Sequence, residues 1–382
     1  MASQRRSART GWLPLGKLQH DDMKRTTQLA HIRQLCCIGI SGQALMPTLL
    51  RAIREYASAD SAGFFWVDAR GEMTNLYADR MLSPGLMRIY FERHYDGGEH
   101  PFRQAFIKRA RAADQVTSST ASPELTRTAY YNEILRHLDA HHVMYAVIRD
   151  QGHALGQLSL YRPRQSPAFS AEDRSAIKDI AHYVAHAVNR PKAVTANVEF
   201  VDADSEGMVV VDFHGQIVEA AAKSLNLLSM ALKREFNPAS PPLVVGEAAQ
   251  GAVQQLLVLL QKAILGVAAA APRLAIDGQW GRFMLSAYAL DGDGAAPASR
   301  AAIHVRRQQP MILKLAEAMG GFDISPQQRE VALLLAQGRS NQQIAEALNV
   351  SGNTVNYHIK QLFMRLDAHD RADAVAKMMA GA

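Results

Sequence analysis

The sequence of 382 residues predicts an α+β multidomain protein, with two antiparallel-sheet domains followed by an all-α domain. Strand–turn–strand patterns, such as the one that opens at Gly207–Asp212, occur in two separate blocks with helical stretches between them. The C-terminal stretch contains repeated helix start signals and no strand pattern. Apolar residues make up 48% of the chain and charged residues 20%, which is typical of a globular protein and allows two to four domains at this length.

Domain boundaries follow from these blocks. They are a disordered basic tail over 1–20, a first sheet domain over 21–190, a second over 197–308, a linker over 309–321 and a helical domain over 322–382. The tail holds Arg5, Arg6, Arg9 and Lys17 but lacks the apolar core of a secretory signal. A frayed tail is favoured over an additional DNA-binding arm.

The first sheet domain is predicted from alternating strand and helix patterns. Two helices over 26–58 precede strands over 62–68 and 72–78, helices over 84–95, 101–111 and 123–139, strands over 142–149 and 155–161, and a long helix capped by Ser170. This order resembles a GAF domain, a sensor fold with an antiparallel sheet and a ligand pocket on one face. The resemblance implies a small-molecule effector, which the sequence does not identify. The aromatic candidates for a pocket lining, with ordinary core packing as the alternative, are Phe64, Trp66, Tyr77, Tyr90, Phe91, Tyr95, Tyr130, Tyr131 and Tyr145.

Cysteine and histidine residues give no metal motif. The adjacent pair Cys36-Cys37 is too small a set for a zinc site and predicts buried thiols near a helix end, with a redox sensor as the alternative. The spacing of the histidines indicates structural roles, and no axial haem ligand stands out: His94, His100, His141 and His142. We therefore expect no metal and no cofactor.

The second sheet domain opens with a strand over 207–212, a turn and a return strand over 216–219. A helix around Leu225, an apolar helix over 248–266 and strands over 274–276, 282–289 and 301–307 follow. The run Glu-Gly-Met-Val-Val-Val-Asp-x-x-Gly-x-Ile-Val from Glu206 resembles the opening of a PAS domain, which implies sensing or dimerisation. A packing or dimerising domain without ligand stays open as an alternative. A short helix over 310–321 is expected to lead to a hinge at Gly320-Gly321.

Four short helices are predicted in the last sixty residues. Ser325, followed by Pro326 and Gln328, gives an N-cap, a proline at the first helical position and a capping-box partner. Gly338 is a left-handed C-cap candidate. The later helices start at serine or aspartate residues, namely Ser340, Ser351 and Asp370.

The third of these helices is amphipathic in a way that suits DNA. Val355, Ile359, Leu362 and Leu366 form one apolar stripe, and the polar or exposed positions are Asn353, Asn356, Tyr357, Lys360, Gln361, Met364 and Arg365. A helix that presents Asn, Tyr, Lys and Arg can meet base edges and phosphates in the major groove. The short link over 349–351 to the preceding helix is typical of a helix-turn-helix.

This stretch resembles the DNA-binding domain of the LuxR family of transcription factors. The shared motifs are Arg329-Glu330-Val331, Ser340-Asn341-Gln342-Gln343-Ile344-Ala345 and Thr354-Val355-Asn356-Tyr357-His358. The resemblance implies double-stranded DNA as partner, a homodimer, RNA polymerase as a further candidate partner, and the DNA-binding residues Ser340, Asn341, Asn353, Thr354, Asn356, Tyr357, Lys360 and Arg365. The family often has Lys where this chain has Asn356, and Asn reads adenine well.

Charge supports a dimer on a two-part site. The six cations and six carboxylates from Asp323 onward cancel, so one copy should bind DNA weakly. Alternative interpretations are a four-helix bundle that only packs, a sigma-like factor, or an enzyme or ligand-binding protein with an incidental helical tail. No receiver-domain pattern, no acyl-homoserine-lactone signature and no GxxxxGK[ST], HExxH or GxSxG motif is found, so we expect no enzyme and no catalytic residues. No run of about 18 apolar residues occurs, and we expect a cytoplasmic protein without a membrane partner.

Overall fold

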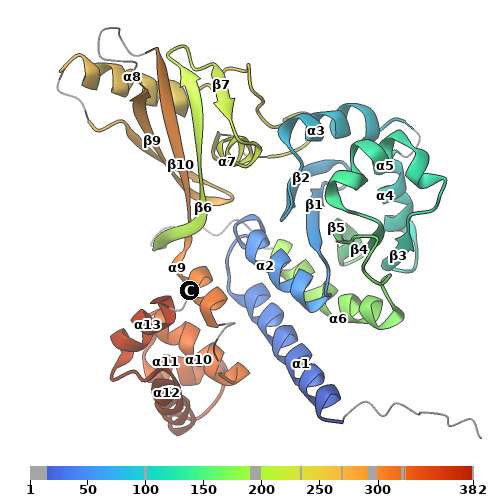
Figure 1. Cartoon of the computed structure of the whole chain (residues 1–382). Coiled ribbons are helices and arrows are strands. Elements are labelled where there is room, and N and C mark those ends of the chain that lie inside the picture. The colour runs from blue at the N-terminus through green and yellow to red at the C-terminus, as the bar shows by residue number, and fades with distance from the viewer. Residues whose placement is uncertain are drawn as a thin grey trace, which may run out of the picture.

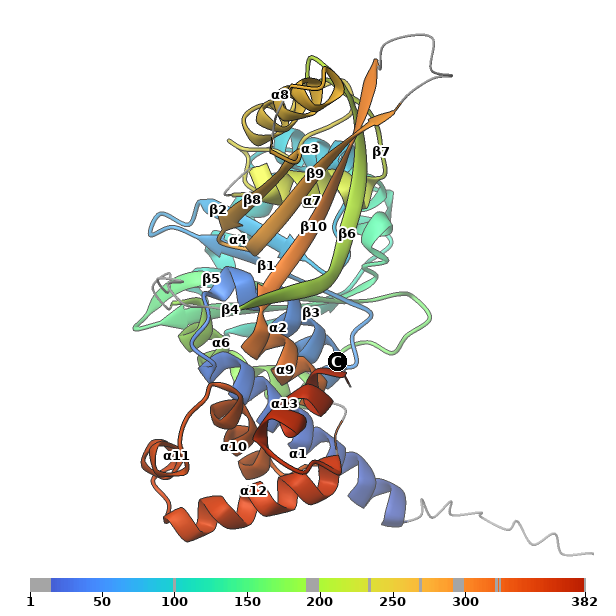
Figure 2. The ribbon, with the colours of Figure 1, turned by 90° about the vertical axis from the view of Figure 1, so that its left-hand side faces the viewer.

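The computed structural model describes residues 15–98, 101–189, 199–232, 235–267, 270–290, 299–319, 322 and 324–380. Two five-stranded antiparallel sheets with their helices are followed by an all-helical unit, as Figure 1 shows. The predicted α+β multidomain class is therefore confirmed. In Figure 2 the helical unit lies at one end of the molecule and the second sheet with α8 at the other.

The first part of the chain contains six α-helices and five strands within the described residues. They are α1 (Leu15–Cys37), α2 (Gly42–Tyr56), β1 (Ser61–Val67), β2 (Met73–Ala78), α3 (Pro84–Ile89), η1 (Tyr90–His94), α4 (Phe102–Arg111), β3 (Val116–Thr120), η2 (Leu125–Arg127), α5 (Ala129–Glu133), η3 (Leu135–Leu138), β4 (His142–Asp150), β5 (His153–Arg162) and α6 (Ala171–Val188). Because α1 begins at Leu15, residues 15–20 are helical and the predicted tail is wrong there. Residues 1–14 lie outside the described part of the chain.

Local capping explains where these helices begin. The Ser41 side chain accepts a hydrogen bond from the Ala44 backbone N–H at the start of α2. Ser170 and Asp173 form a complete capping box at the start of α6, as the sequence predicted. Four apolar side chains of α2 at helical spacing are all buried: Leu45, Leu49, Leu50 and Ile53.

The prediction of one continuous helix over 123–139 is wrong, because the segment contains the three short helices η2, α5 and η3. The Thr128 side chain accepts a hydrogen bond from the Tyr131 N–H and starts a new helix inside the segment. Ile134, at φ −122°, separates α5 from η3, and Asp139 ends η3 in the left-handed conformation. The strand β3 was also missed, because Val116–Thr120 is short and largely polar and pairs only with β4.

The first sheet has the order β2-β1-β5-β4-β3 and separates two layers of helices. Side chains alternate between its faces. One face carries the fully buried Phe64, Leu158 and Ile148 and packs against α2 and α6, with α1 behind them (Figure 1). The other face carries Phe65, Tyr145 and the residues paired with them, and α3, α4 and α5 cover it.

The second sheet has the same strand order as the first when its strands are numbered along the chain. Its order is β7-β6-β10-β9-β8. The elements are β6 (Phe200–Asp212), β7 (Ile217–Ala220), α7 (Ala222–Leu232), α8 (Ala252–Ile264), β8 (Arg273–Gly278), β9 (Gly281–Leu290) and β10 (Arg300–Pro310). The predicted strands are thus confirmed, and the resemblance of this part to a PAS domain stays a prediction. Residues 291–298, between the predicted strands over 282–289 and 301–307, lie outside the described residues.

The turn between β8 and β9 inserts into the first sheet domain. Trp280, at this turn, is fully buried, and its ring meets Trp66 edge-on at 5.8 Å between centroids and Tyr77 at 5.5 Å. The buried Arg307 of β10 donates to the backbone oxygens of Trp280, at 2.8 Å, and of Ala44, at 3.3 Å. One aromatic cluster and one guanidinium therefore join the two sheet domains.

The chain then enters the helical unit without a loop. β10 ends at Pro310 and α9 (Met311–Met319) begins at the next residue. α9 packs against α10 and α13, and α1 packs against α10. The remaining helices are α10 (Pro326–Ala336), α11 (Asn341–Leu348), α12 (Gly352–Leu366) and α13 (Arg371–Ala380). The predicted hinge residues Gly320-Gly321 lie outside the described part of the chain.

Candidate nucleic-acid interface and ligand cavity

Each helix of the C-terminal unit begins where the sequence predicts. Ser325 with Gln328 and Ser340 with Gln343 form complete capping boxes at α10 and α11. The Ser351 side chain accepts from the Thr354 N–H at the start of α12. After α10, the chain passes through Gly338 in the left-handed conformation that glycine adopts readily, at φ +76°.

The turn between α11 and α12 is the short link of a helix-turn-helix. Asn349 ends α11 in the left-handed conformation, which asparagine tolerates better than most residues. The two helices close over a small apolar core with α10, formed by Val331, Leu335, Ile344, Ala345 and Val355. This core fixes the position of α12 relative to α11.

α12 turns its polar side outward. Val355, Leu362 and Leu366 are buried, whereas Asn353, Asn356 and Lys360 are exposed and Tyr357 is 60% exposed. Met364 and Arg365 are exposed as predicted, but Gln361 is only half-exposed. In Figures 1 and 2 α12 lies at the end of the molecule opposite the second sheet.

Two asparagines and one arginine link the helices beside this surface. The Asn341 side-chain amide donates to Asn356 Oδ1 at 2.7 Å, and Arg371 of α13 donates to Asn341 Oδ1 at 3.1 Å. Arg371 also donates to the Arg339 backbone oxygen at 2.7 Å. Sequence reasoning used Arg371 only in the charge balance and missed this role, because the contact spans 30 residues of chain.

The other predicted DNA-binding residues lie on the same side of the unit. Ser340 and Asn341 are exposed at the N-terminus of α11, and Thr354 is half-exposed and bonded to Ser351 at 2.8 Å between hydroxyl oxygens. Lys360 makes no hydrogen bond or ion pair with any described residue, so its ammonium is available to a phosphate. The eight predicted residues thus lie on two neighbouring helices.

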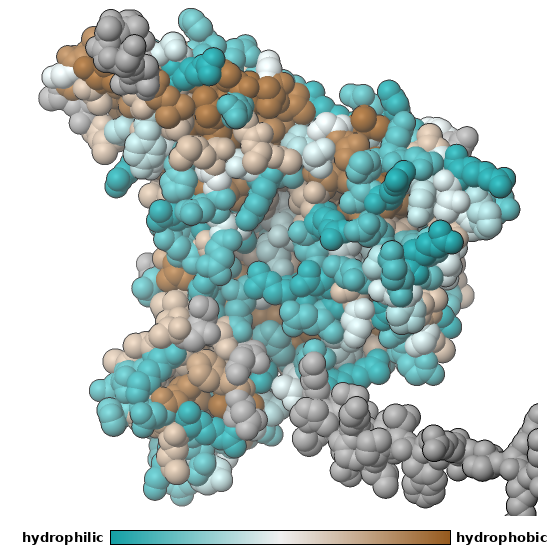
Figure 3. All heavy atoms as spheres, viewed as in Figure 1, coloured by the Kyte–Doolittle hydropathy of each residue, from teal (hydrophilic) through white to brown (hydrophobic). Residues whose placement is uncertain are grey.

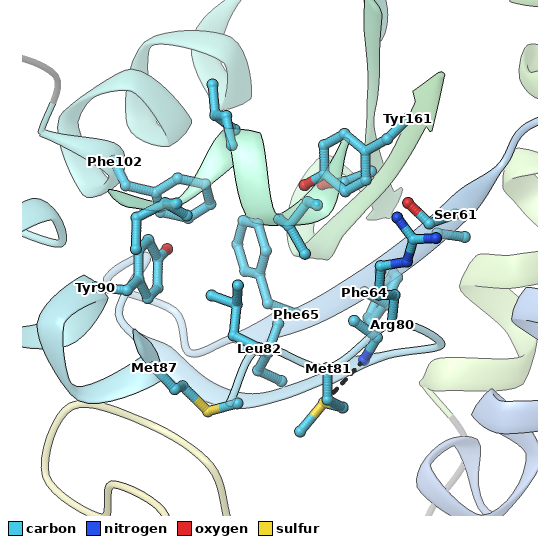
Figure 4. Close-up of a pocket in the computed structure, with 18 of the residues that line it drawn as sticks. Ser61, Phe64, Phe65, Arg80, Met81, Leu82, Met87, Tyr90, Phe102 and Tyr161 are labelled. Carbon is cyan, nitrogen blue, oxygen red and sulfur yellow. Dashed lines mark hydrogen bonds between the residues drawn. The ribbon is translucent and has the colours of Figure 1, made fainter. Parts of the chain in front are cut away.

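A cavity lies between the first sheet and the helices α3, α4 and α5, on the face of the sheet that carries Phe65 and Tyr145. Figure 4 shows one lobe, in which the rings of Phe65, Tyr90 and Phe102 lie close together. This lobe has a volume of about 70 Å³, and an adjoining lobe beside Tyr145 has about 240 Å³. The two lobes share the lining residues Phe102, Tyr130 and Leu135, so they adjoin each other.

Four of the nine aromatic residues predicted for a pocket line this cavity. They are Phe64, Tyr90, Tyr130 and Tyr145. Trp66 and Tyr77 instead pack on Trp280 of the second sheet domain. The lining residues missed from sequence include Phe65, Phe102, Arg109 and Tyr161; their alternation along the strands was the available signal, but it does not say which face is hollow.

Histidine and cysteine residues take structural positions. His94 is buried and lies 2.9 Å from Glu133 through Nε2, and His142 lies 2.9 Å from Thr120 through Nδ1. Cys36 is buried, and burial raises the pKa of its thiol, but Cys37 is exposed, so the prediction of two buried thiols is wrong for Cys37. Across the described ranges, no group of three His, Cys, Asp or Glu residues is placed to hold a metal ion. His100 lies outside these ranges.

None of the described helices is long and apolar enough to cross a bilayer. Apolar side chains are exposed elsewhere, however. Figure 3 shows them gathered over α8, where Val258, Ile264, Leu265 and Val267 are each about half-exposed or more.

Comparison with known families identifies two domains. Residues 323–378 match the bacterial regulatory proteins of the luxR family, and residues 41–188 match the GAF domain. Over 51 residues the chain is 43% identical to YhjB of Escherichia coli (strain K12), whose name describes an HTH-type transcriptional regulator; the match covers 13% of this chain and 26% of YhjB. Over 53 residues it is 43% identical to SgaR of Hyphomicrobium methylovorum, named as a transcriptional regulatory protein, with 14% of this chain and 25% of SgaR covered. The chain thus spans about a quarter of the length of these curated relatives.

Similar solved structures include a complex of Vibrio cholerae VqmA with ligand and DNA. It is 13% identical at a TM-score of 0.22, over 46% of this chain and 83% of VqmA. The sensor region of a sensor histidine kinase is also 13% identical, at a TM-score of 0.19, over 70% of this chain and 93% of that one. Scores this low carry no conclusion about this chain.

Proposed function

We propose that this chain, which carries a luxR-type DNA-binding domain and a GAF domain, is a sequence-specific DNA-binding transcriptional regulator. Its N-terminal domains sense a small molecule, dimerise, or both. The observation that carries the proposal is the polar side of α12, exposed along one edge of the molecule and backed by the buried Val355, Leu362 and Leu366. A helix of this kind is what a helix-turn-helix places in the major groove.

In this proposal some exposed residues of α12 contact base edges and others contact phosphates as well. Asn353, Asn356 and Tyr357 face base edges, and Lys360 and Arg365 serve phosphates as much as bases. Ser340, Asn341 and Thr354 sit at helix N-termini, where backbone N–H groups and small polar side chains bind phosphate well. Asn356 Oδ1 already accepts from Asn341, but a carbonyl oxygen has a second lone pair for a base.

The proposed DNA-bound form is a homodimer. The cations and carboxylates from Asp323 onward cancel, so a single copy has little nonspecific attraction to phosphate. Two copies on half-sites about 34 Å apart would add their binding energies. The exposed apolar side chains of α8 support an interface with a second copy, because patches of this kind often mark association sites. Sedimentation velocity of the full chain tests the dimer.

The proposed partners and cellular location follow from DNA binding as the activity. We propose chromosomal DNA and RNA polymerase as macromolecular partners, the cytoplasm as location, and binding rather than catalysis as the activity. The proposed boundaries of the second sheet domain and the helical domain remain 197–308 and 322–382. The first sheet domain, predicted over 21–190, is extended to residue 15 so that it includes all of α1.

Replacing Lys360 by Ala should weaken binding to every DNA duplex and lower the magnitude of the slope of log affinity against log salt by about 1, because one phosphate contact is lost.

Replacing Asn356 by Ala should lower the binding free energy on the preferred site by about 1–3 kcal/mol and relax the choice of base. Gel shifts of the full chain over a salt series, with duplexes first selected from a random pool, measure both effects.

Lys223→Ala is the matched control, since it removes the same charge from an exposed position on α7, outside both α12 and the proposed α8 interface. It should leave the affinity and the salt slope unchanged. Equal weak binding to all duplexes, unaffected by the α12 substitutions while circular dichroism shows intact helices, would contradict the proposal and favour a ligand-binding or enzymatic protein with an incidental helical tail.

A further inference from the structure

The wall of the GAF-domain cavity that β5 forms carries a row of polar side chains, whereas the interior face of a sheet is usually apolar. Gln157, Ser159 and Tyr161 alternate along β5 and share the face of the sheet that lines the cavity. Gln157 is fully buried and Ser159 nearly so. Buried polar side chains are costly unless they are hydrogen-bonded, so a row of them in a sheet interior calls for a reason.

This row holds one arginine in place. Arg109, in the last turn of α4, donates from Nε to Gln157 Oε1 at 2.8 Å, and Gln157 donates to Ser159 Oγ at 3.2 Å. The guanidinium carbon of Arg109 lies 4.6 Å from the centre of the Tyr145 ring. Arg149 donates to the backbone oxygens of Arg109, Ala110 and Ala112 and so fixes the end of α4.

Among the described residues, no carboxylate neutralises Arg109. Its lobe is lined by Arg109, Ser119, His141 and two tyrosines together with seven apolar residues, and neither lobe has an Asp or Glu among its described lining residues. Among the described residues Arg109 forms no ion pair. A guanidinium that faces a cavity without a counter-ion has unused N–H donors aimed at whatever fills that cavity.

The Tyr145 hydroxyl of the lobe is a donor as well. Burial raises the pKa of this hydroxyl, so it stays protonated near neutral pH and can donate. The Tyr145 hydroxyl makes no hydrogen bond with a described residue. His141 Nδ1 is buried without a partner among the described residues. The lobe therefore offers one positive charge and the Tyr145 hydroxyl donor to an acceptor-rich group.

The second lobe has the opposite character. Phe65, Phe102, Leu82, Met87 and Leu135 are among its lining residues, and the only charged one, Arg80, is paired with Asp139 at 2.5 Å. Phe65 and Phe102 meet edge-on at 5.0 Å between ring centroids. The first lobe, with about 240 Å³, is slightly below the range of roughly 300–1,000 Å³ for small-molecule sites, and the second lobe of about 70 Å³ adjoins it.

We propose that this cavity binds a small monoanionic acid with a single aromatic ring, the carboxylate on Arg109 and Tyr145 and the ring in the apolar lobe against the edge-on pair of Phe65 and Phe102. One unpaired guanidinium matches one negative charge, and its planar donors match the two oxygens of a carboxylate. The small apolar lobe accepts one ring. This assignment rests on the proposed sensor function of the GAF domain and adds the chemical class of its effector.

Calorimetric titration of the full chain, without DNA, tests the assignment with phenylacetate as the probe and phenylacetamide as its uncharged counterpart. Phenylacetate should bind at least about tenfold more tightly than the amide, because the charge-assisted hydrogen bonds need the carboxylate. Arg109→Gln should weaken phenylacetate binding by a similar factor and leave amide binding nearly unchanged. Lys108→Gln, which removes the neighbouring exposed charge, should bind phenylacetate like the original chain.

Tyr145→Phe covers the case in which Arg109→Gln disturbs folding. It keeps the ring under the guanidinium and should weaken phenylacetate binding several-fold through loss of one hydroxyl donor. Equal binding of acid and amide, or phenylacetate binding unchanged in both cavity variants, overturns the proposal. Gel shifts on the same preparations separate the two conclusions: a chain that binds DNA but not phenylacetate overturns only the ligand class, and one that binds phenylacetate but not DNA overturns only the regulator.

Discussion

Replacing Trp280 by Ala should lower the free energy of unfolding by about 3–5 kcal/mol, the range for deleting a large aromatic ring from a packed interior. Trp280 is fully buried at the turn between β8 and β9, and its ring packs on Trp66 and Tyr77 of the other sheet domain. In scanning calorimetry, the two joined domains should therefore unfold at a lower temperature than in the original chain. Trp280→Phe should cost much less, because a ring remains and the indole N–H has no partner among the described residues.

Tyr288→Ala is the control for this measurement. Tyr288 lies on β9 of the same sheet and is 47% exposed, so its loss should change the stability by less than about 0.5 kcal/mol. If Trp280→Ala unfolded at the same temperature as the original chain, Trp280 could not be seated between the two domains as described.

Acid should weaken the fold through His31 of α1. Burial, and secondarily the charge of Arg329 on α10, lower the pKa of His31 from 6.5 to about 4. Because the folded pKa lies below the unfolded one, stability is complete above pH 6.5 and falls as the pH drops toward 4. At pH 5 the loss should be about 2 kcal/mol. Urea unfolding at pH 7 and pH 5 measures it.

His31→Gln should remove this part of the pH dependence, since glutamine does not titrate. His137→Gln, at an exposed position, should leave the pH dependence as in the original chain. The difference between the two variants isolates His31 from carboxylates that titrate in the same interval. A pH dependence that is identical in both would show that His31 is not the residue responsible.

The parts of the fold that depend on neighbouring residues could be predicted from sequence. The capping serines Ser170, Ser325 and Ser340 each bond to a residue three positions on, and the stripe of α12 repeats at helical spacing. These signals lie within a few residues of the structure they specify. For the same reason the exposed side of α12 could be assigned residue by residue.

The parts that depend on distant residues could not be predicted. Trp280 and Arg307 meet the first sheet domain across more than 200 residues of chain, and nothing in their local sequence indicates a partner there. Arg109 depends in the same way on Gln157 of a strand 48 residues away. The break of the predicted helix at Thr128 was a failure of a different kind, because an internal cap competed with a continuous apolar pattern.

The direct passage from β10 into α9 has a mechanical consequence. Because Met311 follows Pro310 directly, a change in the direction of β10, the central strand of the second sheet, would be passed on to α9. Nine helical residues span about 13 Å, so a tilt of about 10° at Met311 would swing the far end by about 2 Å. In the proposed dimer on DNA, a displacement of that size would misalign one copy of α12 with its half-site relative to the other copy.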